Sequence, residues 1–326
     1  MNKKILSVLT GGIVSCAMLL ATTAHGADVV KVTPLGGQDG EFCRLDRALI
    51  FEDPDGTRIL YDAGRTVAGA NDPRLGKIDA VLVSHLHGDH FGDKHTKAPN
   101  AGECGKPDMS VIAAPISNSV AIAVGKDAQV ITGSEMPRFI ARKLKAAGGD
   151  PKKSVLVRFG AMKKVGGVGV TTVPAAHSNG VAGSFIEGPL GESLGAAGLT
   201  AYVGPPTGYV LTFSNGLVVY LSGDTGITAE QDVVVRQHYG AKLVVINIGD
   251  TFTTGPTEAA WVVNELIKPV SVIASHANEV ATNDGKVVAG TRTEKFIKAA
   301  KMPVHLPLSG ITMNFAADGK CVAGCG

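Results

Sequence analysis

The sequence predicts an α/β fold in which two mixed β-sheets pack face to face and helices cover the outer faces. Each half of the chain begins with short apolar runs between turn residues, and then alternates such runs with segments of helical periodicity. No low-complexity linker separates the halves, so residues 27–326 are predicted to form a single domain. The chain has 326 residues, 44% of them hydrophobic and 18% charged, which is enough to bury a core of that size.

The first half supplies most of one predicted sheet. Strands are predicted at residues 29–33, 47–52, 58–61, 78–84, 111–114 and 130–132, and a helix at 137–147. Asp53, Pro54, Asp55 and Gly56 have the composition of a turn, so the strands on either side of them form a predicted hairpin. Residues 92–108 are polar and are predicted to form an inserted loop.

The second half follows the same plan. Strands are predicted at residues 155–158, 168–173, 209–213, 217–221, 243–248, 270–274 and 310–315, and helices at 228–239, 256–267 and 293–300. Asn215-Gly216 between two apolar runs predicts a tight hairpin. Pro256 suits the first turn of the helix that it begins.

Residues 1–26 have the pattern of a secretory signal peptide. Lys3 and Lys4 precede an apolar stretch over residues 5–20, and small residues follow at 24–26. We therefore expect a periplasmic or secreted protein with no membrane association after cleavage. An uncleaved anchor and a lipid attached at Cys16 are the alternatives, but Gly11-Gly12 interrupts the stretch and further apolar residues follow Cys16.

The charge balance argues against a nucleic-acid partner. Removing Lys3 and Lys4 from the 31 lysines and arginines leaves 29, which equals the 29 acidic residues. A nucleic-acid-binding face needs clustered basic residues, and none is evident. A small-molecule substrate is the expected partner.

The cysteine count also fits export. Four cysteines follow the predicted cleavage site, and an even number in an exported chain indicates disulfides. Three connectivities are possible; we favour Cys43 with Cys104 and Cys321 with Cys325. A cysteine-based metal site is the alternative, although the sequence contains no Cys-x-x-Cys pair.

The run from Ser84 to His90 carries the strongest chemical signal. It contains His85, His87, Asp89 and His90 directly after an apolar strand, and imidazole with carboxylate is a ligand set that suits zinc. His85 and His87 are two residues apart on extended chain and so point the same way. Gly88 lets the chain turn, so that Asp89 and His90 can face a second ion.

Three further ligand-type residues follow predicted strands: His177, Asp224 and His276. Taken alone, each is more often a core, surface or turn residue. If the strands end at one edge of the sandwich, these side chains meet the first group there. The shared placement therefore favours a joint metal site.

The ordered pattern His85-x-His87-x-Asp89-His90, His177, Asp224, His276 resembles the metallo-β-lactamase superfamily. The segments 205–209, 222–226 and 248–256 narrow the resemblance to metal-dependent hydrolases related to L-ascorbate-6-phosphate lactonase, and residues 60–64 match the early Asp-x-Gly element of the superfamily. The resemblance implies an αβ/βα sandwich with a dinuclear site at one edge. Most members of that close group are cytoplasmic, whereas this chain has the features of an exported protein.

The resemblance also implies ligand roles. One metal would take His85, His87 and His177, the other Asp89, His90 and His276, and Asp224 would bridge them. Zinc is the expected metal for both positions, with manganese and iron as alternatives. Asp89 is also the candidate catalytic residue that accepts or relays a proton.

Two further carboxylates are candidates for a role at the metal site, and each could instead have an ordinary structural role. Asp62 would orient a ligand histidine, or would simply belong to the turn before Gly64. Asp250 would line the substrate pocket, or would cap the following helix. His95, His238 and His305 are not assigned as ligands.

These features predict a metal-dependent hydrolase in which a metal-bridging hydroxide attacks a lactone, an amide-like bond or a phosphoester. A β-lactamase is one alternative. An iron-dependent oxidoreductase on the same fold is another, although diiron reductases of the superfamily usually carry glutamate where this chain has His87. A binding protein that retains a metal site without turnover is the third.

Overall fold

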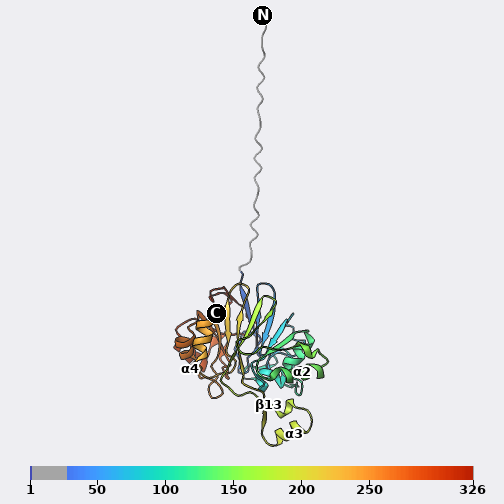
Figure 1. The fold of residues 1–326 in the computed structure, drawn as a ribbon. Helices are drawn as coiled ribbons and strands as arrows, with labels where there is room; N and C mark the ends of the chain where they lie inside the picture. The colour runs from blue at the N-terminus through green and yellow to red at the C-terminus, as the bar shows by residue number, and fades with distance from the viewer. Residues whose placement is uncertain (2–27, 326) are drawn as a thin grey trace.

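The computed structural model describes Met1 and residues 28–325, so residues 2–26 of the predicted signal peptide, including Cys16, lie outside the described residues. Two β-sheets pack face to face, and helices flank them on both outer sides, with α2 on one side and α4 on the other (Figure 1). This is the predicted sandwich of mixed sheets.

The two large sheets contain 8 and 7 strands. In spatial order the first sheet consists of β10 (Ser154–Leu156), β9 (Gln129–Thr132), β4 (Ala80–Leu82), β3 (Arg58–Tyr61), β2 (Leu49–Glu52), β1 (Val30–Pro34), β22 (Met313–Phe315) and β23 (Cys321–Ala323). The second sheet consists of β11 (Met162–Val165), β12 (Val168–Pro174), β15 (Thr207–Thr212), β16 (Val218–Leu221), β17 (Leu243–Asn247), β18 (Ser271–Ser275) and β21 (Val304–His305).

The remaining elements cover the sheets or project from them. The helices are α1 (Asn118–Gly125), α2 (Met136–Ala146), α3 (Pro189–Ala196), α4 (Pro256–Trp261) and α5 (Arg292–Ala299). Other helical segments are η1 (Gly88–Gly92), η2 (Pro151–Lys153), η3 (Gly183–Phe185), η4 (Gln231–His238) and η5 (Val262–Ile267). Small two-stranded ladders pair β5 (Lys94–His95) with β8 (Val111–Ile112), β6 (Gly102–Glu103) with β7 (Lys106–Pro107), β13 (Gly180–Ala182) with β14 (Thr200–Tyr202), and β19 (Thr282–Asn283) with β20 (Lys286–Val287).

Successive side chains of each strand point to opposite faces of the sheet, and this produces three buried apolar layers. In β3, Ile59 and Tyr61 point into the core between the sheets, whereas Leu60 packs toward α1 and α2. In β17, Val245 lies in the central core and Val244 packs toward α4 and α5. Strands buried on both faces explain why these segments are continuous apolar runs rather than alternating ones.

Several elements differ from the sequence-based expectations. Helix α1 was not predicted, and the expected strand at 111–114 is reduced to β8, which pairs with β5 outside the large sheets. Helix α3 and the β13–β14 ladder form a lobe that projects from one end of the sandwich (Figure 1). The polar insertion at 92–108 contains the short strands β5, β6 and β7.

Strand direction brings several chain segments to one edge. Strands β3 and β4 run parallel in the first sheet, and β16, β17 and β18 run parallel in the second. Strand β12 is antiparallel to β15, which is antiparallel to β16, so β12 and β16 share a direction. The segments after β12, β16 and β18 therefore leave the second sheet at the same edge.

The structure pairs Cys43 with Cys104 and Cys321 with Cys325. The first pair is 61 positions apart and the second only 4. By chain entropy, closing the longer loop stabilises the fold by about 4 kcal/mol and closing the shorter one by about 2 kcal/mol. No helix among residues 28–325 is long and apolar enough to cross a membrane.

Candidate metal centre

Seven imidazole and carboxylate side chains converge at the shared sheet edge. They come from the loops after β4, β12, β16 and β18, and they form overlapping groups whose ligand atoms lie within 4.8 Å of one another: His85, His87 and His177; His85, His90 and Asp224; Asp89, His90 and His276. The structure thus brings together every residue that the sequence pattern singled out as a metal ligand.

Two histidines of the first group lie near one oxygen of Asp224. The Nε2 atom of His85 lies 2.9 Å from Nδ1 of His87 and 3.9 Å from Oδ2 of Asp224. The Nε2 atom of His177 lies 3.7 Å from the same oxygen. Three nitrogens and one carboxylate oxygen are a donor set that suits a tetrahedral divalent ion.

The histidines of the second group contact both Asp89 and Asp224. The Nε2 atoms of His90 and His276 lie 3.6 Å and 3.4 Å from Oδ2 of Asp89. They also lie 3.3 Å from Oδ1 and 3.1 Å from Oδ2 of Asp224, respectively. The Asp224 carboxylate is therefore close to the donor atoms of both groups.

Unpaired buried atoms test whether a cation fits here. The Nε2 atoms of His90 and His276 and the Oδ1 atom of Asp224 are buried and make no hydrogen bond among the described residues. A buried polar atom without a partner costs about 1–3 kcal/mol. Metal ions would satisfy all three atoms, so the residues fit the ions that the donor chemistry implies.

The chain turns sharply where it carries Asp89 and His90. Gly92 follows them with φ +84, and a Cβ atom at this position would lie 2.4 Å from Cβ of Asn118. Asn118 in turn donates hydrogen bonds to the backbone carbonyls of Gly64 and Val67. Helix α1, which sequence patterns missed, therefore holds this turn against the loop after β3.

Asp62 contacts Nδ1 of His90, the ring nitrogen that faces away from Asp89 and Asp224. Its Oδ2 lies 2.8 Å from Nδ1 of His90 and accepts a hydrogen bond from the Ser84 hydroxyl, while its Oδ1 accepts one from the Ser84 backbone N–H. Asp62 is 1% exposed and has φ 40, a left-handed conformation that is uncommon for aspartate. A carboxylate against Nδ1 directs the lone pair of Nε2 toward the site.

Arg47 was not singled out by the sequence, yet it contacts the site directly. Its guanidinium donates to Oδ2 of Asp89 at 3.1 Å and to the Asn278 side chain at 2.7 Å, and its side chain is 2% exposed. Arg47 lies inside a predicted strand, 42 residues from Asp89, so no local pattern reveals the pair.

Neighbouring side chains keep the two carboxylates of the site ionised. Burial alone would raise the pKa of Asp89, but His90, His276 and Arg47 outweigh burial and hold that pKa well below its usual range. Burial likewise opposes ionisation of Asp224, and His90 and His276 again hold the pKa well below its usual range. Both carboxylates are therefore anionic near neutral pH and available to cations.

The histidines of the first group stay neutral. Burial lowers the pKa of His85 well below its usual value, and neighbouring histidines lower it further. Burial also lowers the pKa values of His87 and His177. A neutral imidazole carries the lone pair that a metal requires.

A cavity of about 500 Å³ opens over the centre, and five of the seven side chains line it: His87, Asp89, His177, Asp224 and His276. Asp250 lines it, with Arg44, Arg65 and Arg292 around the same opening. Arg65 pairs with Asp93 and Arg292 lies 4.0 Å from Asp250, but no ion pair of Arg44 is found among residues 28–325.

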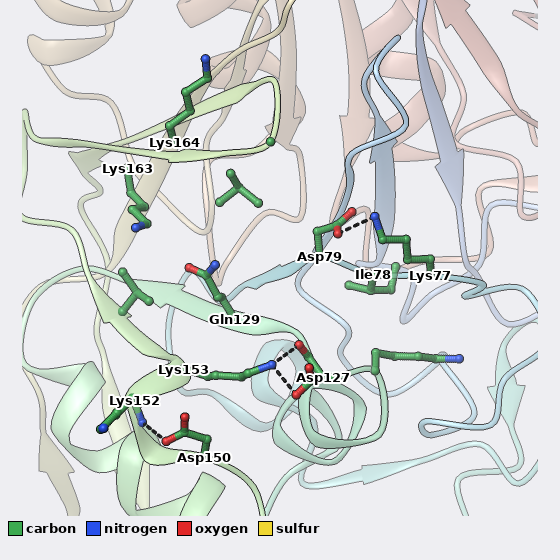
Figure 2. A pocket seen from close by; sticks show the side chains of 14 residues that line it. Lys77, Ile78, Asp79, Asp127, Gln129, Asp150, Lys152, Lys153, Lys163 and Lys164 are labelled. Carbon is green, nitrogen blue, oxygen red and sulfur yellow. Dashed lines mark hydrogen bonds and ion pairs between the residues drawn. The ribbon is translucent and has the colours of Figure 1, made fainter.

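A second cavity, of about 680 Å³, lies away from this centre, beside the starts of β4 and β9. Figure 2 shows that lysines dominate it, and that Lys77 pairs with Asp79 and Lys153 with Asp127. It contains no histidine or cysteine, so larger volume alone does not make it the better candidate for catalysis.

Comparisons with known proteins agree with the geometry. Residues 57–276 match the family described as the Beta-lactamase superfamily domain. A UPF0173 metal-dependent hydrolase from Polynucleobacter asymbioticus is 28% identical, over 94% of this chain and 96% of its own length. Another, from Cupriavidus necator, is 31% identical over 68% of each chain.

Solved structures share the fold at low identity. A metallo hydrolase from Ignicoccus hospitalis superposes with a TM-score of 0.54 at 20% identity, covering 88% of this chain and 98% of its own. A diiron β-hydroxylase from Streptomyces venezuelae gives 0.53 at 12% identity, covering 89% of this chain and 54% of its own. At these identities the likeness concerns the fold alone.

Proposed function

Because the chain belongs to the β-lactamase superfamily and is a metal-dependent hydrolase, we propose that it is an exported dinuclear enzyme acting on a small anionic substrate. The observation that carries the proposal is the pair of ligand groups that meet at Asp224, with three buried ligand atoms that make no hydrogen bond among the described residues.

In this proposal His85, His87 and His177 hold one ion, Asp89, His90 and His276 hold the other, and Asp224 is shared. Two divalent ions, with zinc expected, would supply a hydroxide nucleophile at neutral pH and polarise the bond under attack. The protein's own task is to keep the ligands oriented and in the correct protonation state.

Asp89 is the proposed proton acceptor. Arg47 holds its carboxylate in place beside the Nε2 atoms of His90 and His276. The Asp62 carboxylate, 2.8 Å from Nδ1 of His90, fixes the tautomer of that histidine. Charged groups positioned before the reaction need little reorganisation during it, which is where electrostatic catalysis gains most.

The scissile bond is proposed to be a lactone, an amide-like bond or a phosphoester. Arg44 lines the cavity without an acidic partner among residues 28–325, so it is free to bind an anionic group of the substrate. A carboxylate or phosphate matches a guanidinium, because two parallel hydrogen bonds can form.

Export is proposed from the pattern of residues 1–26. The disulfides of the folded domain support it, since such bonds persist in oxidising compartments.

The test is hydrolysis by the zinc-loaded protein of a mixed panel of lactones, β-lactams and phosphodiesters. The proposal predicts turnover of at least one class by the wild type, and loss of metal and turnover together in His87→Ala. Unchanged hydrolysis in that variant would remove the assigned site. Turnover by the iron form alone, and only with oxygen, would favour an oxidoreductase instead.

A further inference from the structure

A second cluster of metal-binding side chains lies where the edges of the two sheets meet. Its members are His305 on β21, at the end of the second sheet, and Cys321 and Cys325 on and after β23, at the end of the first. Their ligand atoms lie within 4.8 Å of one another, and none of them belongs to the seven-residue centre. The cluster therefore bridges the two layers of the sandwich.

His305 has an unused nitrogen in this cluster. Its Nε2 atom is buried and has no hydrogen-bond partner among the described residues. The ring packs edge-on against Phe315 of β22, with centroids 5.6 Å apart, which fixes its orientation. Burial lowers the pKa of His305, so the imidazole is neutral and can offer a lone pair.

The two cysteines are paired across a short loop but remain approachable. Their Cα atoms are 6.2 Å apart, and both residues are only partly buried against the central core. Cys43, by contrast, is 1% exposed. A thiol reductant can therefore approach the Cys321–Cys325 bond from either cysteine, but the Cys43–Cys104 bond only from Cys104, which is also partly buried.

We propose that His305, Cys321 and Cys325 form a binding site for copper(I) that opens when the Cys321–Cys325 disulfide is reduced. The sequence indicates no ligand role for His305, and it leaves a cysteine-based metal site only as the alternative to the disulfides, because it contains no Cys-x-x-Cys pair. The fold provides the third ligand, because it places a histidine from the other sheet beside both sulfur atoms.

The site forms in two balanced steps. Two thiols of a small-molecule or protein reductant transfer two electrons and two protons to the Cys321–Cys325 bond, giving two cysteine thiols and one new disulfide on the reductant. Copper(I) then displaces both thiol protons to solvent and binds two thiolates and the imidazole. The metal does not change oxidation state.

The donor set selects the metal. Thiolates are soft ligands and favour copper(I), which is satisfied by few donors, whereas a structural zinc site requires four. The cluster offers only three. The seven-residue centre has the opposite preference, since it contains nitrogen and oxygen donors only.

The experiment titrates copper(I) into zinc-loaded full-length protein against a chromophoric copper(I) chelator, before and after reduction with a phosphine that is then removed. Wild type is compared with Cys321→Ser/Cys325→Ser, with His305→Ala, and with His238→Ala as a control for loss of an exposed histidine. Cys43 and Cys104 are present in every variant, so any copper that they bind is common to all.

The proposal predicts that reduced wild type binds one copper(I) more than the double serine variant, with a thiolate-to-copper absorption band. Oxidised wild type should not bind this additional copper(I) ion. His305→Ala should hold it about tenfold or more weakly, whereas His238→Ala should match wild type. Equal copper binding by reduced wild type and the double serine variant, or by wild type and His305→Ala, would overturn the proposal. Retained hydrolysis and near-ultraviolet circular dichroism show that each variant is folded.

Discussion

Replacing Asp62 with asparagine tests how the protein prepares His90 for a metal. In the wild type one carboxylate oxygen faces both the Ser84 hydroxyl and Nδ1 of His90, at 2.7 Å and 2.8 Å. In Asp62→Asn an amide NH₂ takes the place of one oxygen, because the other must still accept the Ser84 backbone N–H. The amide then donates to Nδ1 of His90, and the imidazole proton moves to Nε2.

A proton on Nε2 blocks the atom that faces Asp89 and Asp224. Loss of such an orienting partner typically weakens metal binding by 10–100-fold, which corresponds to about 1.4–2.7 kcal/mol. We expect Asp62→Asn to lose one of two bound ions at concentrations where wild type keeps both, and to lose hydrolysis with it.

The assay is metal content after dialysis, combined with competition against a chelator of known affinity. Asp53 provides a matched control, because it is 2% exposed and accepts hydrogen bonds from the backbone N–H and hydroxyl of Ser214 in nearly the same arrangement. Asp53→Asn should lower stability without changing metal affinity. Equal metal affinity in Asp62→Asn and wild type would refute the reasoning.

Three further outcomes are expected. Arg44→Gln should raise KM about tenfold for an anionic ester while leaving a neutral ester unaffected; equal changes for both would exclude substrate recognition by Arg44. Tyr209→Phe should lower the free energy of unfolding in urea by about 1–3 kcal/mol, because the Val83 and Ile131 carbonyls lose their buried hydroxyl donor, while metal content stays the same. Burial raises the pKa of Asp46 to about 7, against opposing hydrogen bonds and nearby arginines, so the folded state holds this proton more tightly than the unfolded chain. The stability that Asp46 contributes should therefore fall as pH rises from about 4 to 7, by at most about 1.4 kcal/mol per pH unit. Urea unfolding of wild type and Asp46→Asn measures this contribution, and a difference between the two that stays constant over that range would contradict it.

The sequence predicts the strands well because most are buried on both faces and appear as apolar runs. It misses α1 because Val120, Ile122 and Val124 are branched residues that favour strands, and only the Ser117 side chain, which caps the first turn, marks a helix. The lobe around α3 is rich in glycine and has no helical periodicity to detect. Long-range packing decides both.

The candidate site, like the fold, could be predicted where the signal is local in the sequence and not where it depends on long-range contacts. Its histidines and aspartates stand out because ligand-type residues after apolar strands are unusual, and strand direction then brings them to one edge. Arg47 and His305 were missed because their partners come from distant segments. Arg47 binds Asp89 across 42 positions, and His305 meets two cysteines through the pairing of sheet edges. The spacing of residues along the sequence does not reveal contacts between such distant segments.

The most direct measurement is anomalous diffraction at the zinc edge from crystals of the zinc-loaded protein. We expect two peaks beside Asp224, one bound by His85, His87 and His177 and the other by Asp89, His90 and His276. A single peak, or zinc bound away from these side chains, would contradict the dinuclear centre.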